Sequence, residues 1–205
     1  AIGWGGFVAG EPRFVSDLLA VDPAWRNLGL GAELKRLQAA HAATRGFQEI
    51  VWTVDPLRAA NARLNFEKLG AIARRYEIDR YGADYGAGLY GGLPTDRLHL
   101  TWRLDAPRTI RRLLGQDRMM AAADVAGLPL YQPGIAANRS VVALPADIDR
   151  LLREAPAKAG EWRLRLRAAL TAAFGDGFAI VGFVAAPGLA GGEAVYLLER
   201  ENEPA

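Results

Sequence analysis

Several residue types that carry specific chemistry are absent from this chain or scarce in it. There is no cysteine, which excludes disulfides, a cysteine nucleophile and thiolate metal sites. The two histidines, His41 and His99, lie far apart in the sequence, so we expect no metal. No apolar run approaches the roughly 20 residues of a membrane-spanning helix, and no basic segment opens the chain as in a signal peptide. These absences predict a cytoplasmic protein without a membrane partner.

Charge of one sign is also scarce. Lys and Arg number 25 against 23 Asp and Glu, and the net charge of +2 is too small to predict a nucleic-acid partner. The 205 residues are 51% hydrophobic and 23% charged, a composition typical of a chain that buries a core. The length fits one large domain or two small ones.

Glycine is placed where it can shape a binding loop. Residues 14–21 predict a strand and residues 32–43 a helix, with Leu30, Leu34, Leu37 and His41 near one face. Between them lies Val-Asp-Pro-Ala-Trp-Arg-Asn-Leu-Gly-Leu-Gly, residues 21–31. The first turn of a helix has backbone N–H groups without internal partners, and glycine lets an anion approach them. The loop is therefore a candidate cradle for a phosphate or pyrophosphate, with a plain strand-to-helix turn as the alternative.

A second strand and helix follow. Residues 48–54 predict a strand, and residues 57–69 predict a helix that ends before a glycine, as at a helix C-terminus. Asp55 is expected to cap this helix, with a position facing an acceptor amine as the alternative. Asn61 and Asn65 are four residues apart and share one helix face.

These two units together resemble the GNAT superfamily of CoA-dependent N-acyltransferases. The resemblance rests on Val-Asp-Pro-x-x-Arg-x-x-Gly-x-Gly followed by Asn-x-x-x-x-Phe-Glu-Lys-Leu-Gly, and it covers residues 1–104. The segments Trp-Thr-Val-Asp-Pro-Leu and Leu-Pro-Thr-Asp-Arg resemble a bacterial branch in which some members acylate amino acids, including from succinyl-CoA. The resemblance implies acetyl-CoA or another acyl-CoA as co-substrate, no metal, a small amine such as an amino acid as acceptor, and direct attack in a ternary complex.

The resemblance also implies residue roles. The pantetheine arm of CoA is expected between two parallel strands that splay apart. Free backbone groups of the first strand, usually at a bulge, are expected to hydrogen-bond the thioester carbonyl. The implied CoA-binding residues are Leu19, Ala20, Val21, Arg26, Asn27, Leu28, Gly29, Leu30, Gly31, Ala32, Asn61 and Asn65. Solvent exposure or a local backbone bond is the alternative for the two asparagines.

The expected proton transfers involve one matching position and one departure. Asp17 is the expected catalytic base, taking the amine proton directly or through water, with a strand-edge carboxylate without chemistry as the alternative. Phe66 occupies the position where the superfamily commonly has a tyrosine that protonates the leaving thiolate. Water, Tyr76 or Tyr81 would have to replace it. The competing interpretation is a non-catalytic CoA-binding or structural module.

The predicted fold class is α/β (α+β), a GNAT-like mixed, mostly antiparallel sheet flanked by helices. Residues 1–105 would form a core lacking the first strand and two helices of the superfamily. Residues 106–205 would form a C-terminal α/β lobe that is appended, completes the core or makes a homodimer contact. Residues 158–174 predict an amphipathic helix with Arg163 and Arg167 off its apolar face, and residues 81–92 an acceptor-site flap or a surface loop.

Overall fold

The structure is a computed structural model of residues 1–205, and it describes residues 1–8, 10–82, 92–185 and 194–200. Its strands are β1 (Ile2–Val8), β2 (Glu11–Leu18), β3 (Glu49–Val54), β4 (Ile72–Glu77), β5 (Arg97–Arg103), β6 (Arg139–Leu144), β7 (Phe178–Ala185) and β8 (Ala194–Arg200). Its helices and helical turns are η1 (Pro23–Trp25), α1 (Leu30–Ala43), α2 (Ala59–Ala62), η2 (Arg63–Leu69), α4 (Pro107–Leu113), η3 (Ala122–Asp124), α5 (Ile148–Glu154) and α6 (Pro156–Gly175).

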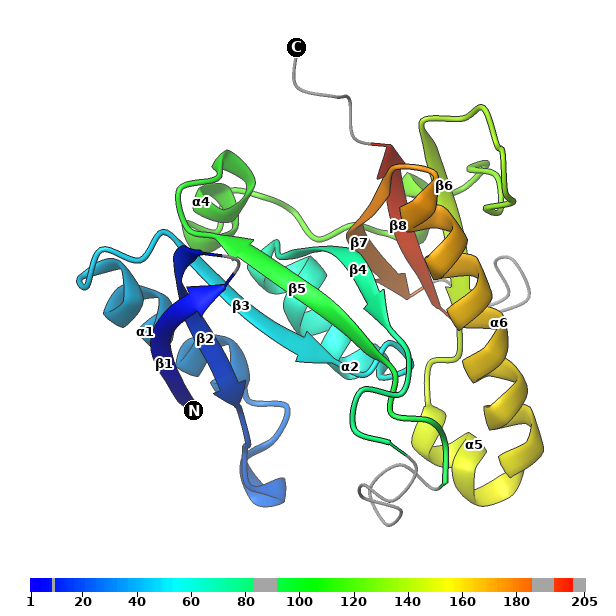
Figure 1. The fold of residues 1–205 in the computed structure, drawn as a ribbon, viewed down its shortest axis with the longest axis horizontal. Coiled ribbons are helices and arrows are strands. Elements are labelled where there is room, and N and C mark those ends of the chain that lie inside the picture. Colours follow the sequence, from blue (N-terminus) through cyan, green and yellow to red (C-terminus); the bar gives the residue numbers. More distant parts are fainter. Residues whose placement is uncertain (9, 83–91, 186–193, 201–205) are drawn as a thin grey trace.

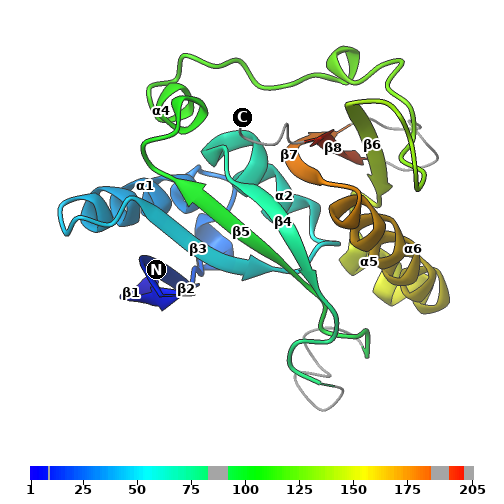
Figure 2. The same ribbon diagram turned by 45° about the horizontal axis from the view of Figure 1, so that its top comes forward.

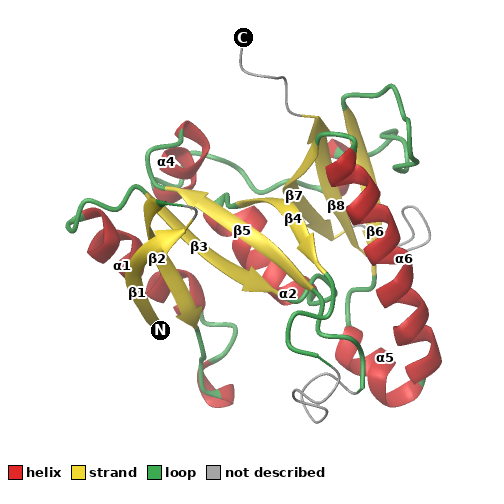
Figure 3. Ribbon diagram, in the orientation of Figure 1, coloured by secondary structure: helices red, strands yellow, loops and turns green. Residues whose placement is uncertain are grey.

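The described strands form one sheet in the order β1-β2-β3-β5-β4-β7-β8-β6 (Figure 1). Only β2 and β3 pair in parallel, and every other neighbouring pair is antiparallel. Helices flank the sheet (Figure 3). The expected mixed, mostly antiparallel α/β fold is therefore confirmed.

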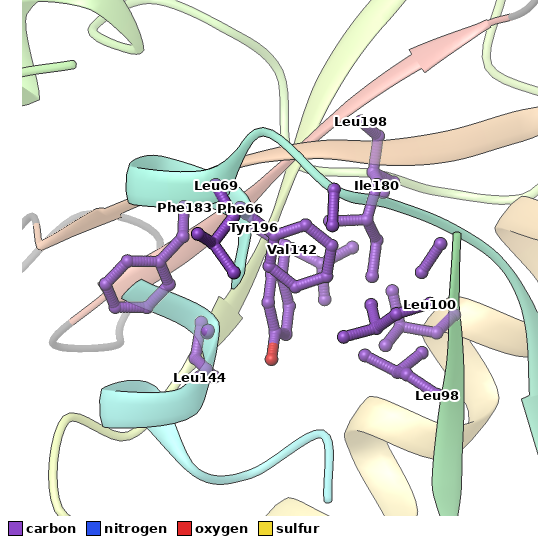
Figure 4. Close-up of a cluster of buried hydrophobic side chains, with 14 of the residues drawn as sticks. Phe66, Leu69, Leu98, Leu100, Val142, Leu144, Ile180, Phe183, Tyr196 and Leu198 are labelled. Atoms are coloured by element: carbon purple, nitrogen blue, oxygen red, sulfur yellow. The ribbon is translucent and has the colours of Figure 1, made fainter. Parts of the chain in front are cut away.

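The two halves of the chain share this sheet and a core. β4 pairs with β7 through Ala73 and Ile180, so the C-terminal strands extend the sheet of the N-terminal half. Buried side chains from both halves meet in one cluster (Figure 4). In it the rings of Phe66 and Tyr196 pack edge-on, with their centroids 5.5 Å apart. The division at residue 105 stays a prediction. Residues 83–91, most of the predicted flap, lie outside the described residues.

The buried faces of two helices differ from the predicted ones. On α1, Leu37 is 67% exposed, and the face toward the sheet consists of Ala32, Lys35, Gln38, Ala39 and Ala42. Alanines allow close approach to the sheet, and the lysine finds polar partners there. On α6, Arg163 is 1% exposed because its Nη2 forms an ion pair at 2.9 Å with Asp55 at the end of β3. The placement of Arg163 off the buried face was wrong.

The C-terminal helices lie beside the sheet half that they extend. α6 packs against β4, β6 and β7, and α5 packs against α6 (Figure 2). Arg167 of α6 donates two hydrogen bonds to Asp96, whose carboxylate is fully buried. Arg58, just before α2, pairs with Asp149 of α5 at 2.9 Å. These polar contacts fix the C-terminal helices to the ends of β3 and β5.

Candidate active site

The parallel pair β2–β3 separates along its length. Its register contains two residue pairs, Phe14 with Ile50 and Val15 with Val51, and none after them. Past this point lies a cavity of about 320 Å³, which we call the strand-gap cavity. It is lined by residues of β2 and β3, by Lys35 of α1, by Asn61, Leu64 and Asn65 of α2 and η2, and by Arg97. The two strands thus leave an opening in the sheet where backbone groups have no partner strand.

A second cavity of about 410 Å³ lies across the same opening, and we call it the open-face cavity. Ser16, Asp17, Trp52 and Thr53 line both cavities. Successive side chains of a strand point to opposite faces, so these neighbours connect the two sides of the sheet. Arg74, Arg75, Arg80 and His99 also line the open-face cavity; Arg80 pairs with Glu77, and burial lowers the pKa of His99.

The loop after β2 leads to the N-terminus of α1. The strand ends at Leu18, earlier than predicted, and Leu19 lines the strand-gap cavity. Asp22 accepts a hydrogen bond from the Ala24 N–H, which closes the turn η1. Arg26 donates from Nε to the Val21 carbonyl at 3.1 Å and so ties the two ends of the loop together.

Gly29 is the N-terminal cap of α1. Its φ of +83° is left-handed, which explains why glycine is used here. It has no side chain to cap the helix, and within the described chain no acceptor meets the N–H groups of Leu30 and Gly31. Asn27 also has a positive φ, and residues 22–28 are exposed. The backbone N–H groups at the start of a 14-residue helix are therefore open to an anion.

Asp17 occupies a bulge in β2. The register with β1 shifts between Ile2 and Gly3, which pair with Leu18 and Ser16, so Asp17 is the extra residue. A bulge reorients a side chain and interrupts strand pairing. The Asp17 carboxylate is exposed and lines both cavities, and no described residue donates a hydrogen bond to it.

The asparagines and Phe66 take different positions. Asn61 and Asn65 both line the strand-gap cavity, and the Asn65 carbonyl accepts a hydrogen bond from the Ala71 N–H. They lie at the junction of α2 with η2, a π-helical segment that bulges the helix. Phe66 points away into the core and is fully buried.

Lys35 was not predicted as a site residue. Its side chain is 2% exposed, its Nζ donates to Ser16 Oγ at 2.7 Å, and Nζ lies 3.8 Å from the Trp52 ring centroid. Burial lowers the pKa of Lys35 to about 7. The sequence contained one signal, because Ala32, Ala39 and Ala42 mark a close-packed helix face that includes position 35.

The Leu-Pro-Thr-Asp-Arg segment serves both packing and the site. The Asp96 carboxylate accepts from Tyr76 Oη at 2.6 Å and from the Asp79 N–H at 3.0 Å. Burial and the hydrogen bond to Asp96 raise the pKa of Tyr76 well above its usual value. Arg97, 5% exposed, lines the strand-gap cavity and stacks on Tyr81. Burial raises the pKa of Tyr81, but contacts with Thr53 and Arg97 outweigh it and the pKa falls below its usual value.

Asp55 has two partners at the cavity rim. Its Oδ1 accepts from the Leu57 N–H at 2.9 Å, and it pairs with Arg163. The N-cap of α2 is Arg58 rather than Asp55, so the expected cap is wrong in its position. Asp55 instead holds the turn that leads into the helix.

The described residues contain no group of three or more His, Asp or Glu side chains arranged to hold a metal ion. None of their helices is long and apolar enough to cross a bilayer.

Comparison with known sequences assigns the N-terminal segment. Residues 1–71, from β1 through η2, match the sequence profile of the acetyltransferase (GNAT) family. This segment belongs to the GNAT family. The GNAT segment contains the loop before α1, the separating strands and both asparagines. No curated protein matches the chain.

A solved structure, the NatC complex bound to Gag peptide and CoA, aligns with TM-score 0.41 and 18% identity. The alignment covers 50% of this chain and 58% of that chain, so this chain spans little more than half of the matched one.

Proposed function

We propose that this protein is an acyl-CoA-dependent N-acyltransferase that moves an acetyl or another acyl group, such as succinyl, to the amine of a small molecule. The observation that carries the proposal is the strand-gap cavity, which opens between β2 and β3 directly beside the loop of the GNAT segment. Acyl-CoA enters as co-substrate, and the residues present fit it.

The fit has two parts. The free N–H groups of Leu30 and Gly31 and the dipole of α1 suit the pyrophosphate, and Gly29 leaves the approach open. The unpaired edges of β2 and β3 suit the amide-containing pantetheine arm, because each offers backbone donors and acceptors. Both parts belong to the loop and strands of the GNAT segment, with Asn61 and Asn65 on the cavity wall.

The acceptor would approach from the open-face cavity. Asp17 faces it as an unpaired carboxylate and takes the proton that the attacking amine loses. Backbone N–H groups of β2 near the bulge stabilise the oxyanion, and binding both substrates across one opening supplies proximity. Arg75 on the wall of this cavity favours an amine that also carries a carboxylate, such as an amino acid.

Calorimetric titration with acetyl-CoA, succinyl-CoA and free CoA tests the first step. We expect binding with a preference for one acyl form, followed by thiol release when the matching amine is added. Asp17→Asn should keep the binding and lose most of the thiol release. A folded protein that binds none of the three compounds would contradict the proposal.

The buried Phe66 favours a second candidate, a CoA-binding module without transferase activity. This candidate predicts CoA binding without thiol release for every amine tested. The amine panel therefore separates the two functions, since both predict the same calorimetric result with free CoA.

A further inference from the structure

Lys35 is a buried cation without a carboxylate partner. Its Nζ donates to Ser16 Oγ and lies 3.4 Å from Gln38 Oε1, and among the described residues no acidic side chain reaches ion-pair distance. Burying an unpaired ammonium opposes folding, whereas an apolar side chain of the same length would not. Packing alone therefore does not explain a lysine at this position.

The charged groups around Lys35 are few. Asp17 of β2, Asp55 after β3, Arg58 before α2 and Arg97 of β5 line the same cavity. β1 carries no titratable side chain, and η2 faces the cavity with Leu64 and Asn65. Asp55 is engaged by Arg163 and Arg58 by Asp149, so Asp17 is the acidic group on this cavity that no described cation holds.

The proposed reaction needs a proton donor in the strand-gap cavity, which Lys35 lines. When the amine attacks, the C–N bond forms and the C–S bond breaks, and the electron pair stays on sulfur. Phe66 has no proton to give and is buried against Tyr196. Tyr76 donates its hydroxyl hydrogen to Asp96 and does not line the cavity.

We propose that the Lys35 ammonium donates the proton that neutralises the leaving CoA thiolate, an inference that rests on the acyltransferase function proposed above. The protons balance over one turnover. The amine loses one proton to Asp17, which passes it to solvent, and neutral Lys35 takes one proton back from solvent. The Ser16 hydroxyl, hydrogen-bonded to Nζ, lies between the lysine and the open-face cavity and offers a path for that return.

The energetics favour this direction of transfer. A solvated lysine, with a pKa of 10.5, would hold its proton more tightly than a thiol, whose pKa is about 8.5. Burial lowers the pKa of Lys35 to about 7, so proton transfer to a thiolate becomes favourable while part of the lysine stays protonated near neutral pH.

The test compares Lys35→Met and Lys35→Arg with the wild-type protein. We expect kcat for thiol release to fall about 100-fold or more in both, since general acid catalysis contributes about 10² to 10⁴ and an arginine holds its proton too tightly. CoA affinity by calorimetry should change less than about threefold. The wild-type kcat should decline as the pH rises past about 7, and this decline should vanish in Lys35→Met.

Two further variants keep the test decisive. Ser16→Ala removes a hydrogen bond that favours the charged form, so the decline should begin at lower pH, a shift that a structural role of Lys35 would not produce. Tyr81→Phe removes a phenol hydroxyl next to the cavity-lining residues Thr53 and Arg97, and it should keep the decline unchanged. A Lys35→Met variant with kcat within threefold of wild type, or a decline that moves only with Tyr81→Phe, would refute the role of Lys35. Absence of thiol release from the wild-type protein with every amine would instead refute the transferase function itself, and the inference with it.

Discussion

Replacing Lys35 by methionine should make the protein more stable near neutral pH. A folded-state pKa of about 7 against 10.5 for a solvated lysine corresponds to a cost of about 5 kcal/mol for burying the ammonium. The cost is present in full below pH 7, where the folded protein must keep the buried ammonium charged. Methionine has similar length and no charge, so it removes this term and can pack against the Trp52 ring.

The sign follows from proton binding in the two states. Between pH 7 and 10.5 the unfolded chain holds a proton on Lys35 that the folded protein has released, so the free energy of unfolding rises with pH in this range. The limiting slope for one such group is about 1.4 kcal/mol per pH unit. The advantage of Lys35→Met should therefore be largest at pH 7 and below, and should shrink as the pH approaches 10.

Urea unfolding followed by circular dichroism measures this difference. Wild type and Lys35→Met are compared at several pH values from 6 to 10, and the difference in free energy of unfolding is plotted against pH, which cancels groups common to both. A difference that is constant over this range, or a variant less stable than wild type at pH 6, would refute the argument that Lys35 is buried as an unpaired cation.

Three other predictions follow from the site. Asp55→Asn should destabilise the protein by about 3 to 5 kcal/mol, because it leaves the buried Arg163 guanidinium without its ion-pair partner. Arg163→Met should cost less, because the Asp55 carboxylate that it leaves unpaired borders a cavity. Equal losses of unfolding free energy in urea would contradict this. Gly29→Ala should weaken CoA binding at least tenfold in calorimetry. The matched Gly46→Ala, with φ of +82° in the turn after α1, should lose similar stability and keep the affinity. Asp17→Asn should lower kcat about 100-fold or more at unchanged CoA affinity, and a variant as active as wild type would remove Asp17 from the mechanism.

Most elements of the fold could be predicted from the sequence because their patterns are local. Residues 48–54 were expected as a strand and β3 spans Glu49–Val54; residues 158–174 were expected as a helix and α6 spans Pro156–Gly175. The joining of β4 to β7 could not be predicted, because strand neighbours far apart in sequence are selected by tertiary packing.

The candidate site also contains residues that local motifs predict and residues that only long-range contacts explain. The loop up to Gly29 and the helix face of Asn61 and Asn65 follow from short motifs, and the structure brings both asparagines to the cavity. Lys35 and Arg163 were missed for one physical reason. Periodicity assigns charged residues to the solvent side, whereas these two are held inside by partners from other elements, Ser16 and Asp55.

The C-terminal half holds residues that line the strand-gap cavity. Asp55, Arg58 and Arg97 all line the strand-gap cavity, and the first two are held by Arg163 of α6 and Asp149 of α5. Arg97 follows Asp96, whose buried carboxylate accepts from Arg167. Without α5 and α6, Asp55 and Arg58 would lose these partners, and Asp55 could pair with cations inside the cavity. The ion pairs therefore keep Asp55 and Arg58 in place at the wall of the cavity.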